Sequence, residues 1–249
     1  MKTAIIIGAT SGIGREVAAH LVEKGWKVGI TGRRTEALES FRNEYGSDKV
    51  CIATMDITHD DSVAALDALL EQTGEPDLFL YASGVGYQNQ ELDLDKEIST
   101  VRTNCEGMVR MVDHYVNYVR CHKYSAMHKA HIAVISSVAG VAGLGTAPAY
   151  SATKRMQSHY LSALAQLARM EHIPIRFTDI RPGFIATDIL NPDKHYPMLM
   201  SKEKAADNIM KALRRMKRVY TFDWRFRVAS FIWSLTPRCI WERITWIKN

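Results

Sequence analysis

The most constraining feature of this chain is a glycine-rich turn near its amino terminus. The sequence GATSGIG at 8–14 follows a short apolar run at 4–8 and opens a segment, 12–24, whose apolar residues recur at helical spacing. Its glycines permit a tight turn and a close approach of the backbone to a phosphate, while the helix start presents free N–H groups and a positive dipole end. A glycine-rich run alone is weak evidence, but this strand–turn–helix context favours a dinucleotide site. The expected contacts are Gly8, Thr10, Ser11, Gly12, Ile13 and Gly14.

Short apolar runs recur along the rest of the chain, as in strands that are buried on both faces of a parallel sheet. They are expected at 4–8, 26–31, 49–55, 77–82, 131–136, 174–180 and 218–222. The segments between them suit crossover helices, with two long ones expected at about 96–121 and 150–171. This alternation predicts an α/β fold, a Rossmann-like doubly wound parallel sheet with helices on both faces. No linker divides the chain, so a single domain is expected over 1–249.

The end of the second expected strand indicates which dinucleotide is bound. An NAD site usually places a carboxylate about 20 residues after the glycine motif, where it binds the ribose 2′-hydroxyl. This chain has Thr31, Gly32, Arg33 and Arg34 there, with no carboxylate to repel a 2′-phosphate. Arg33, with Arg34 or Arg15 nearby, could clamp that phosphate through charge-assisted hydrogen bonds. NADP(H) is therefore favoured over the alternative that these arginines are solvated surface residues.

Composition narrows the class of protein. The chain has 249 residues, of which 47% are hydrophobic and 24% charged, as in an ordinary globular protein. Cys51, Cys105, Cys121 and Cys239 are widely spaced, which predicts reduced thiols in a cytoplasmic protein. No Cys/His cluster has zinc-site spacing, so no metal is expected. The amino terminus does not read as a signal peptide, because its apolar run is short and leads directly into the glycine-rich turn.

Further motifs resemble the short-chain dehydrogenase/reductase family over roughly residues 3–190. The glycine spacing is that family's variant of the nucleotide fingerprint, and Asp56, followed by Ile57, resembles its acid that hydrogen-bonds the adenine amino group. YASG at 81–84 stands where the family has Asn-Asn-Ala-Gly, so a contact through the backbone alone is implied. RPG at 181–183 with Thr187 resembles the loop that orients the nicotinamide carboxamide. The resemblance thus implies cofactor contacts at Asp56, Ile57, Gly84, Pro182, Gly183, Ile185 and Thr187.

The same resemblance assigns a catalytic group. Asn104 matches the family's catalytic asparagine, Ser137 lies 13 residues before Tyr150, and Lys154 follows Tyr150 by four. It implies that Tyr150 is the general acid/base, that Ser137 holds the substrate oxygen and that Asn104 holds a water in a relay reaching Lys154. Asn104, Tyr150 and Lys154 count among the cofactor-binding residues as well, with Lys154 on the nicotinamide ribose. The implied activity is transfer of a hydride between NADP(H) and a carbonyl or alcohol.

The spacing of two of these residues supports the chemistry independently. Tyr150 and Lys154 are four apart on an expected helix, so their side chains share a face. A phenol with an ordinary pKa of about 10 is a poor proton donor or base at neutral pH. A nearby ammonium and an oxidised nicotinamide both favour the phenolate, and they are expected to lower the pKa of Tyr150. Ser137 follows the strand at 131–136, at the carboxyl edge where such folds hold ligands.

Two other functional classes fit parts of the sequence. A fold of this kind can keep its cofactor and lose its chemistry, which would give a non-catalytic regulatory dinucleotide-binding protein; the intact catalytic group argues against it. A nucleic-acid binder is favoured only by the basic isoelectric point, and no nucleic-acid motif is present.

Ser136 is the alternative to Ser137 as the functional serine. His131, His159 and His172 occupy no motif position and are interpreted as surface or core residues.

The segment at about 188–200 is expected to line or cover the substrate pocket. It is short and mostly apolar, with Tyr196, Met198, Leu199 and Met200, which favours a hydrophobic ketone or alcohol. Members of the family commonly pair through the two long helices, so a homodimer is expected, with a tetramer as the alternative. The tetramer is less favoured because this chain replaces the family's usual final strand with a different ending.

Residues 224–249 are expected to form a basic, Trp-rich helical extension. Four of the five tryptophans lie there. From Lys211 onward the sequence contains ten Lys or Arg residues and only two Asp or Glu residues. Apolar residues follow helical spacing on both sides of Pro237, but the longest uncharged run, 228–237, is too short to span a membrane. Interleaved Arg and Trp residues fit peripheral docking on an anionic lipid surface. Packing on the protein itself or on a dimer partner is favoured over such docking, and a cover over the substrate pocket that opens at a membrane is a third possibility.

Overall fold

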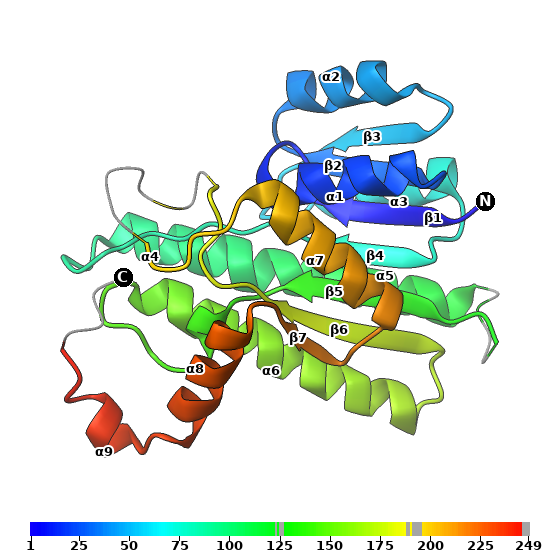
Figure 1. The fold of residues 1–249 in the computed structure, drawn as a ribbon. Helices are drawn as coiled ribbons and strands as arrows, with labels where there is room; N and C mark the ends of the chain where they lie inside the picture. Colours follow the sequence, from blue (N-terminus) through cyan, green and yellow to red (C-terminus); the bar gives the residue numbers. More distant parts are fainter. Residues whose placement is uncertain (123, 125–126, 188–189, 191–195, 246–249) are drawn as a thin grey trace.

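The computed structural model describes residues 1–122, 124, 127–187, 190 and 196–245. Its centre is one sheet of seven parallel strands in the order β3-β2-β1-β4-β5-β6-β7 (Figure 1). The strands are β1 (Thr3–Ile7), β2 (Lys27–Gly32), β3 (Val50–Thr54), β4 (Leu78–Tyr81), β5 (Ala130–Ile135), β6 (Ile175–Arg181) and β7 (Val219–Thr221). The chain runs outward from β1 to β3 and then returns to β4, so a topological switch point lies between β1 and β4.

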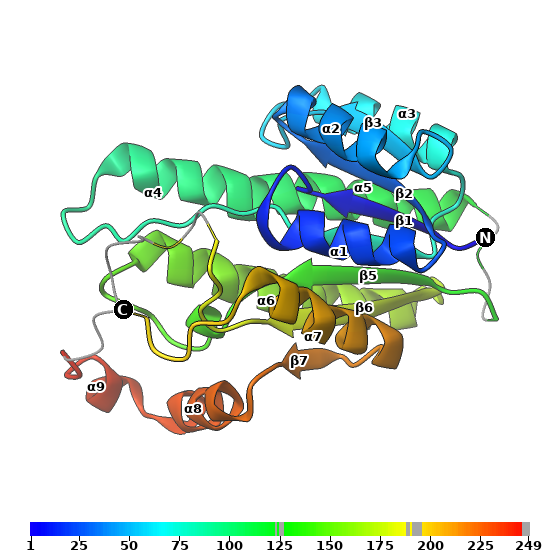
Figure 2. The same ribbon diagram turned by 45° about the horizontal axis from the view of Figure 1, so that its top comes forward.

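Helices cover both faces of this sheet (Figures 1 and 2). They are α1 (Gly12–Glu23), α2 (Thr35–Tyr45), α3 (Ser62–Thr73), α4 (Leu94–Val101), α5 (Gly107–Cys121), α6 (Pro148–Met170), α7 (Lys202–Arg215), α8 (Trp224–Leu235) and α9 (Arg238–Trp241). Apolar side chains of α1, α2 and α7 form one hydrophobic core with the sheet, and those of α3, α5 and α6 form another on its opposite face. The predicted doubly wound α/β fold is therefore confirmed.

The continuous apolar runs of the sequence are explained by these two cores. Successive side chains of a strand point to opposite faces of its sheet. In β1, Ile5 and Ile7 belong to one core, whereas Ala4 and Ile6 belong to the other, and all four are fully buried. Each of the seven expected strands is present, with ends that differ from the prediction by one residue.

One predicted element differs from the structure. The long helix expected at about 96–121 begins at Leu94 and is interrupted by a π-helical segment, Arg102–Glu106, between α4 and α5. A π-helical turn contains one residue more than an α-helical turn, and such turns are often found at functional sites. Asn104 lies in the middle of this segment and is fully buried. Periodicity alone could not locate the interruption, because the apolar spacing on both sides is helical.

The carboxyl-terminal residues form two helices that lie beside the sheet's β7 edge (Figure 2). α8 ends at Leu235, and α9 starts after Pro237, where the sequence places the break. Phe226 is the buried residue of α8, and its ring lies against Gly183, where a β-carbon would overlap it. The opposite side of α8 exposes Trp224, Val228, Phe231, Ile232 and Leu235. Within the described ranges, no helix is long and apolar enough to cross a membrane.

Candidate active site

A cleft of about 430 Å³ lies at the carboxyl edge of the sheet, lined by loops that follow β1, β2, β3 and β4. This is the switch-point position at which doubly wound folds bind ligands. Most of the predicted cofactor contacts line the cleft: Gly8, Thr10, Ser11, Gly12, Ile13, Gly14, Arg33, Arg34, Asp56, Ile57, Gly84 and Thr187. The structure thus brings together residues that lie far apart in the sequence.

The glycine-rich turn between β1 and α1 requires its glycines. Gly8 has φ of +90° and Gly12 has φ of +57°, in the left-handed region that side chains disfavour. A β-carbon at Gly14 would overlap the carbonyl oxygen of Gly8, so the turn can close only with glycine at that position. α1 begins at Gly12, and its first N–H groups therefore lie at the cleft, where they favour a bound phosphate.

Two arginines lie at the β2 end of the cleft. Arg34 donates a hydrogen bond to the Thr10 hydroxyl at 3.1 Å, and Arg33 is exposed beside it. Burial alone would raise the pKa of Asp56, but hydrogen bonds from Thr58 and the charge of Arg33 outweigh it, so the pKa is lowered. Asp56 is therefore ionised at neutral pH.

Arg15, which the sequence offered as a second phosphate clamp, has a different role. Its guanidinium donates to the Glu44 carboxylate at 3.0 Å and to the Ala37 carbonyl at 3.3 Å, and it lies over the Phe41 ring. Arg15 does not line the cleft. Arg33 and Arg34 are thus the two cleft-lining arginines at this end.

Ser137 and Tyr150 meet beside the cleft. Ser137 follows β5 and caps a short 3₁₀ turn by accepting a hydrogen bond from the Ala139 N–H at 3.1 Å. Tyr150 lies in the first turn of α6, which Pro148 starts with its fixed φ. Burial raises the pKa of Tyr150, and a hydrogen bond with Ser137 offsets part of that rise. The lowering expected from the sequence is therefore not present in the protein alone, because the burial of the phenol outweighs the other contributions.

Lys154 is buried on α6, one turn after Tyr150. Its ammonium donates to the Ile135 carbonyl and to the Gln157 side-chain oxygen, both at 3.0 Å, and lies 5.7 Å from the centre of the Tyr150 ring. Burial lowers the pKa of Lys154 to about 8, against the opposing effects of Asp179 and Cys105. The predicted sharing of one helix face by Tyr150 and Lys154 is confirmed by this proximity.

Asn104 is held by hydrogen bonds on every side of its amide. Its side-chain oxygen accepts from the Val85 N–H at 2.9 Å, and its side-chain nitrogen donates to the Val85 carbonyl at 2.8 Å and to the Thr153 hydroxyl at 3.0 Å. Its own main-chain carbonyl accepts from the Gln157 side chain at 2.8 Å. The π-helical segment thus links the loop after β4 to α6.

A comparison with known proteins identifies the family. The family model described as short chain dehydrogenase matches residues 2–196. The chain belongs to the short-chain dehydrogenase/reductase family. An uncharacterized oxidoreductase of Myxococcus xanthus is 28% identical, over 97% of this chain and 95% of its own length. A protein of Dictyostelium discoideum, described as dehydrogenase/reductase SDR family protein 7-like, is 28% identical over 96% of this chain and 79% of its own.

Solved structures of dehydrogenases and reductases share the fold. A family member from Mycobacterium ulcerans superimposes with a TM-score of 0.76 at 23% identity and covers 98% of each chain. An alcohol dehydrogenase from Thermococcus sibiricus, described as complexed with 5-hydroxy-NADP, has a TM-score of 0.74 at 22% identity over 89% of this chain and 95% of that one. A Brucella melitensis 3-ketoacyl-(acyl-carrier-protein) reductase, complexed with NADH, has a TM-score of 0.76 at 24% identity over 89% and 96%.

The loop that the family resemblance assigns to the nicotinamide lies only partly at the cleft. Thr187 lines it, but Pro182, Gly183 and Ile185 do not. The Pro182 carbonyl accepts from the Val138 N–H at 3.0 Å, Gly183 lies under the Phe226 ring, and Ile185 is buried. In the protein alone these three residues therefore have structural contacts, and their cofactor contact stays a prediction.

The expected substrate segment is described only in part. Residues 188–189 and 191–195 lie outside the described residues, whereas Tyr196 is buried and packs against Phe184 with ring centres 5.1 Å apart. Met198 has a left-handed backbone with φ of +57°, and Leu199 is exposed. The assignment of this segment to the substrate stays a prediction.

Several site residues were missed by the sequence analysis. Gly86 lies against the Tyr150 ring, Thr153 bonds Asn104, and Gln157 joins Lys154 to Asn104. Gln157 lies three residues after Lys154, so its place on the same helix face could have been found from spacing. The contact made by Gly86 had no sequence signal, because it depends on how the loop after β4 crosses α6.

The residues that competed for catalytic roles have structural partners or lie on the surface. Ser136 donates to Asp179 and to the Ile180 carbonyl, so Ser137 is the serine that faces Tyr150. His131 is buried in β5 with the Thr178 hydroxyl 2.8 Å away. His159 and His172 are exposed.

Proposed function

We propose that this short-chain dehydrogenase/reductase uses NADPH to reduce a hydrophobic ketone or aldehyde to the alcohol. The observation that carries the proposal is the contact of Ser137 with Tyr150, next to a glycine-lined cleft and one helical turn from a buried Lys154. A phenol that meets a hydroxyl beside a glycine-lined cleft suits proton transfer to a substrate oxygen. Asn104 completes the group by fixing the loop that carries Val85.

The proton step follows from the pKa directions. The cofactor, when bound, supplies the hydride that reaches the carbonyl carbon. Because burial raises the pKa of Tyr150, the phenol is protonated at neutral pH and can donate its proton to the carbonyl oxygen. Ser137 would donate a hydrogen bond to that same oxygen and hold it beside the phenol. Lys154 would stabilise the phenolate left behind, because a cation close to it favours the charged form.

The residues present fit a dinucleotide with a 2′-phosphate. The glycine turn leaves room for a backbone approach, and the start of α1 favours an anion. Arg33 and Arg34 line the end of the cleft that follows β2, where an NAD site would place a carboxylate. The guanidinium groups would hold the 2′-phosphate through charge-assisted hydrogen bonds, whereas Asp56, ionised and close to Arg33, would bond the adenine amino group.

The proposal is tested with a panel of carbonyl compounds and purified protein. The panel contains aliphatic, aromatic and polycyclic ketones and aldehydes of graded size, and consumption of NADPH is followed by its absorbance. We expect turnover with apolar members and little turnover with charged or very small ones. If NADPH binds tightly but no member turns over, the protein is the non-catalytic dinucleotide-binding regulator that forms the alternative.

We also propose a homodimer that pairs through α4–α5 and α6, as family members commonly do, with a tetramer as the alternative. All four cysteines are free thiols, which supports a reducing compartment such as the cytoplasm.

Peripheral docking on an anionic membrane is proposed for α8 and α9. It is supported by the exposed apolar side of α8 and by Arg225, Arg227, Arg238 and Arg243 on the same two helices and just after them.

A further inference from the structure

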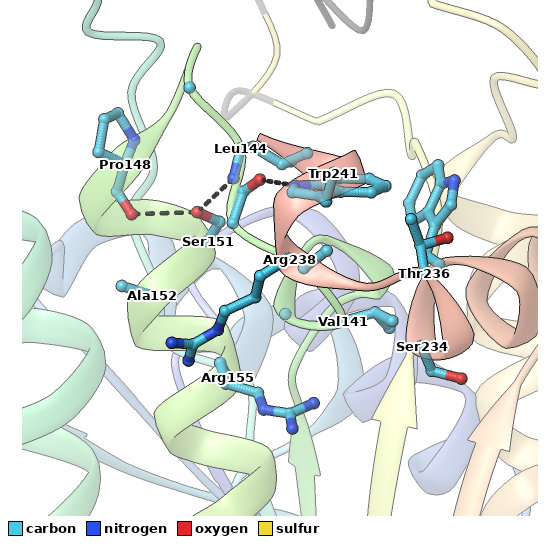
Figure 3. Close-up of a pocket in the computed structure, with 15 residues that line it drawn as sticks. Val141, Leu144, Pro148, Ser151, Ala152, Arg155, Ser234, Thr236, Arg238 and Trp241 are labelled. Atoms are coloured by element: carbon cyan, nitrogen blue, oxygen red, sulfur yellow. Dashed lines mark hydrogen bonds between the residues drawn. The ribbon is translucent and has the colours of Figure 1, made fainter. Parts of the chain in front are cut away.

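A second cavity, of about 610 Å³, lies between the loop that joins β5 to α6 and the two carboxyl-terminal helices (Figure 3). It shares no lining residue with the cofactor cleft. Its floor is the loop Gly140–Gly145, one wall is the first turns of α6, and the other wall is formed by the end of α8 and by α9. Its volume is within the range of sites for small molecules, about 300–1,000 Å³.

The charge of this cavity is entirely positive. Arg155 of α6 and Arg238 of α9 both line it, and no carboxylate lines it within the described part of the chain (Figure 3). In that same part, neither guanidinium has an ion-pair or hydrogen-bond partner, whereas Arg15, Arg110 and Arg225 are each paired with a carboxylate. Two unpaired guanidinium groups facing one cavity match the oxygens of a phosphate, which arginine binds in a bidentate manner.

The remaining walls are apolar and aromatic. The Trp233 and Trp241 rings meet edge to face with their centres 5.5 Å apart, and the Trp241 indole N–H donates to the Gly143 carbonyl at 2.7 Å. The loop is also fixed from its other side, because the Ser151 hydroxyl accepts from the Leu144 N–H at 3.0 Å. The cavity is thus a formed site in which an apolar group can contact indoles while an anionic group contacts arginines.

We propose that this arginine–tryptophan cavity binds the phosphate of an anionic amphiphile, with Arg155 and Arg238 on the phosphate and Trp233 and Trp241 on the apolar part. The exposed Phe231, Ile232 and Leu235 stand next to it on α8 and supply the apolar surroundings in which such a molecule is found. The proposal does not depend on the redox function. Because the loop between Ser137 and Tyr150 forms the floor, a bound ligand would contact the segment that connects those two residues.

The test uses three soluble probes, each below its micelle concentration: dihexanoyl phosphatidic acid, dihexanoyl phosphatidylcholine and inorganic phosphate. Titration calorimetry is run with saturating dinucleotide so that the phosphate sites of the cofactor cleft are filled. We expect phosphatidic acid to bind at least tenfold more tightly than the other two. In the double variant Arg155→Gln/Arg238→Gln that affinity should fall at least tenfold, as expected for the loss of charge-assisted hydrogen bonds.

The matched control is Arg214→Gln/Arg215→Gln, which removes the same charge from exposed positions on α7, outside the cavity. It should bind phosphatidic acid like the wild type, and thermal unfolding shows whether each variant is folded. Equal losses in the two double variants would mean attraction by net charge alone and would overturn the site. Inorganic phosphate binding as tightly as phosphatidic acid would overturn the amphiphile, leaving a site for a free phosphate.

A second inference concerns Gln157, which lies wholly buried between two members of the catalytic group. Its side-chain oxygen accepts from the Lys154 ammonium at 3.0 Å, and its side-chain nitrogen donates to the Asn104 carbonyl at 2.8 Å. Among the described residues, the Gln157 side-chain oxygen and the Ile135 carbonyl are the two hydrogen-bond acceptors of the ammonium. An amide can hold an ammonium in place, but it has no titrating group of its own to take up a proton.

We infer that Gln157 is a positioning residue, which fixes the Lys154 ammonium and sets how readily it gives up its proton. The inference deepens the proposed reaction and rests on it for its kinetic consequence only. Gln157→Leu removes an acceptor from a buried cation, so the pKa of Lys154 should fall below its value of about 8. Gln157→Glu places a carboxylate there, so the pKa should rise.

The direct readout is ¹³C NMR titration of the Lys154 side chain, which needs no substrate and is assigned with Lys154→Arg. The pKa of Lys154 should be lowest in Gln157→Leu, intermediate in the wild type and highest in Gln157→Glu. The basic limb of the pH profile of kcat/KM should shift in the same order. A purely structural role would lower activity at every pH without moving either value. Identical Lys154 pKa values in the folded wild type, Gln157→Leu and Gln157→Glu would contradict the inference. Because this readout needs no substrate, it does not depend on whether the proposed reaction is correct.

Discussion

The ring of Tyr150 lies directly against Gly86, so closely that a β-carbon at position 86 would overlap it. The loop after β4 therefore contacts the Tyr150 ring directly and limits where the ring can lie. Gly86→Ala should displace the ring and reduce turnover, while the glycine turn and the arginines proposed to hold the cofactor stay unchanged. Gly145→Ala is the matched control, because a β-carbon there meets no atom within 4 Å. We expect a fall in kcat of at least tenfold for Gly86→Ala and little change for Gly145→Ala, with NADPH affinity kept in both.

The proposed preference for NADPH rests on Arg33. Its guanidinium should lose charge-assisted hydrogen bonds to a 2′-phosphate in Arg33→Ala, at a cost of about 1.5–3 kcal/mol in NADPH binding. NADH lacks that phosphate, so its affinity should hardly change. Arg15→Ala is the control, because Arg15 is paired with Glu44 and does not line the cleft. Equal NADPH affinities of wild type and Arg33→Ala, measured by fluorescence titration, would show that the phosphate lies elsewhere.

The sequence predicts those features of the fold and the site that depend on neighbouring residues, but not those that depend on contacts between residues far apart in the chain. The strands and α1 follow from local patterns, and so does the pairing of Tyr150 with Lys154, since a helix repeat fixes it. The π-helical segment around Asn104 depends on contacts with Val85 and Thr153, which come from two other elements. For the same reason the sequence could not show that burial outweighs the other effects on the pKa of Tyr150.

The carboxyl-terminal helices α8 and α9 were likewise predictable only from their local pattern. Its helices and the break at Pro237 follow from spacing and from the inability of proline to continue a helix. That Phe226 would pack on Gly183, and that Trp241 would bond Gly143, could not be read from the pattern. Both contacts join residues far apart in the chain, so they depend on the assembled sheet.

His131 should make the protein sensitive to acid. Burial, helped by the charge of Arg176, lowers its pKa to about 4 from an ordinary value near 6.5. Between these values an unfolded chain takes up a proton that the folded chain refuses, so stability falls as the pH drops from about 6.5 to about 4. Urea unfolding at pH 7 and pH 4.5 should show a loss about 2–3 kcal/mol smaller in His131→Gln than in the wild type. His159→Gln, at an exposed position, should lose as much as the wild type.

Docking of α8 and α9 on lipid is tested by sedimentation with vesicles. The wild type should pellet with vesicles rich in phosphatidylserine, less so at high salt because surface charges are screened, and hardly at all with phosphatidylcholine. Phe231→Ser/Leu235→Ser should abolish pelleting, because it removes two exposed apolar groups from α8. Leu92→Ser/Leu94→Ser is the matched control, because these residues are also exposed but lie outside α8 and α9, and this variant should pellet like the wild type. A wild type that stays in the supernatant at low salt would leave only packing roles for the exposed side of α8.

The central claim is that Tyr150 donates the proton in an NADPH-dependent reduction. Tyr150→Phe removes the ionisable hydroxyl and keeps the ring that packs on Gly86, so cofactor binding and stability should be retained. With a substrate from the carbonyl panel, the loss of general acid catalysis should reduce the rate constant of NADPH oxidation by about 100- to 10,000-fold. The measurement is single-turnover oxidation of enzyme-bound NADPH by wild type and Tyr150→Phe at pH 7. A loss of that size with unchanged NADPH affinity is the predicted result, and a variant that turns over at the wild-type rate would contradict the account.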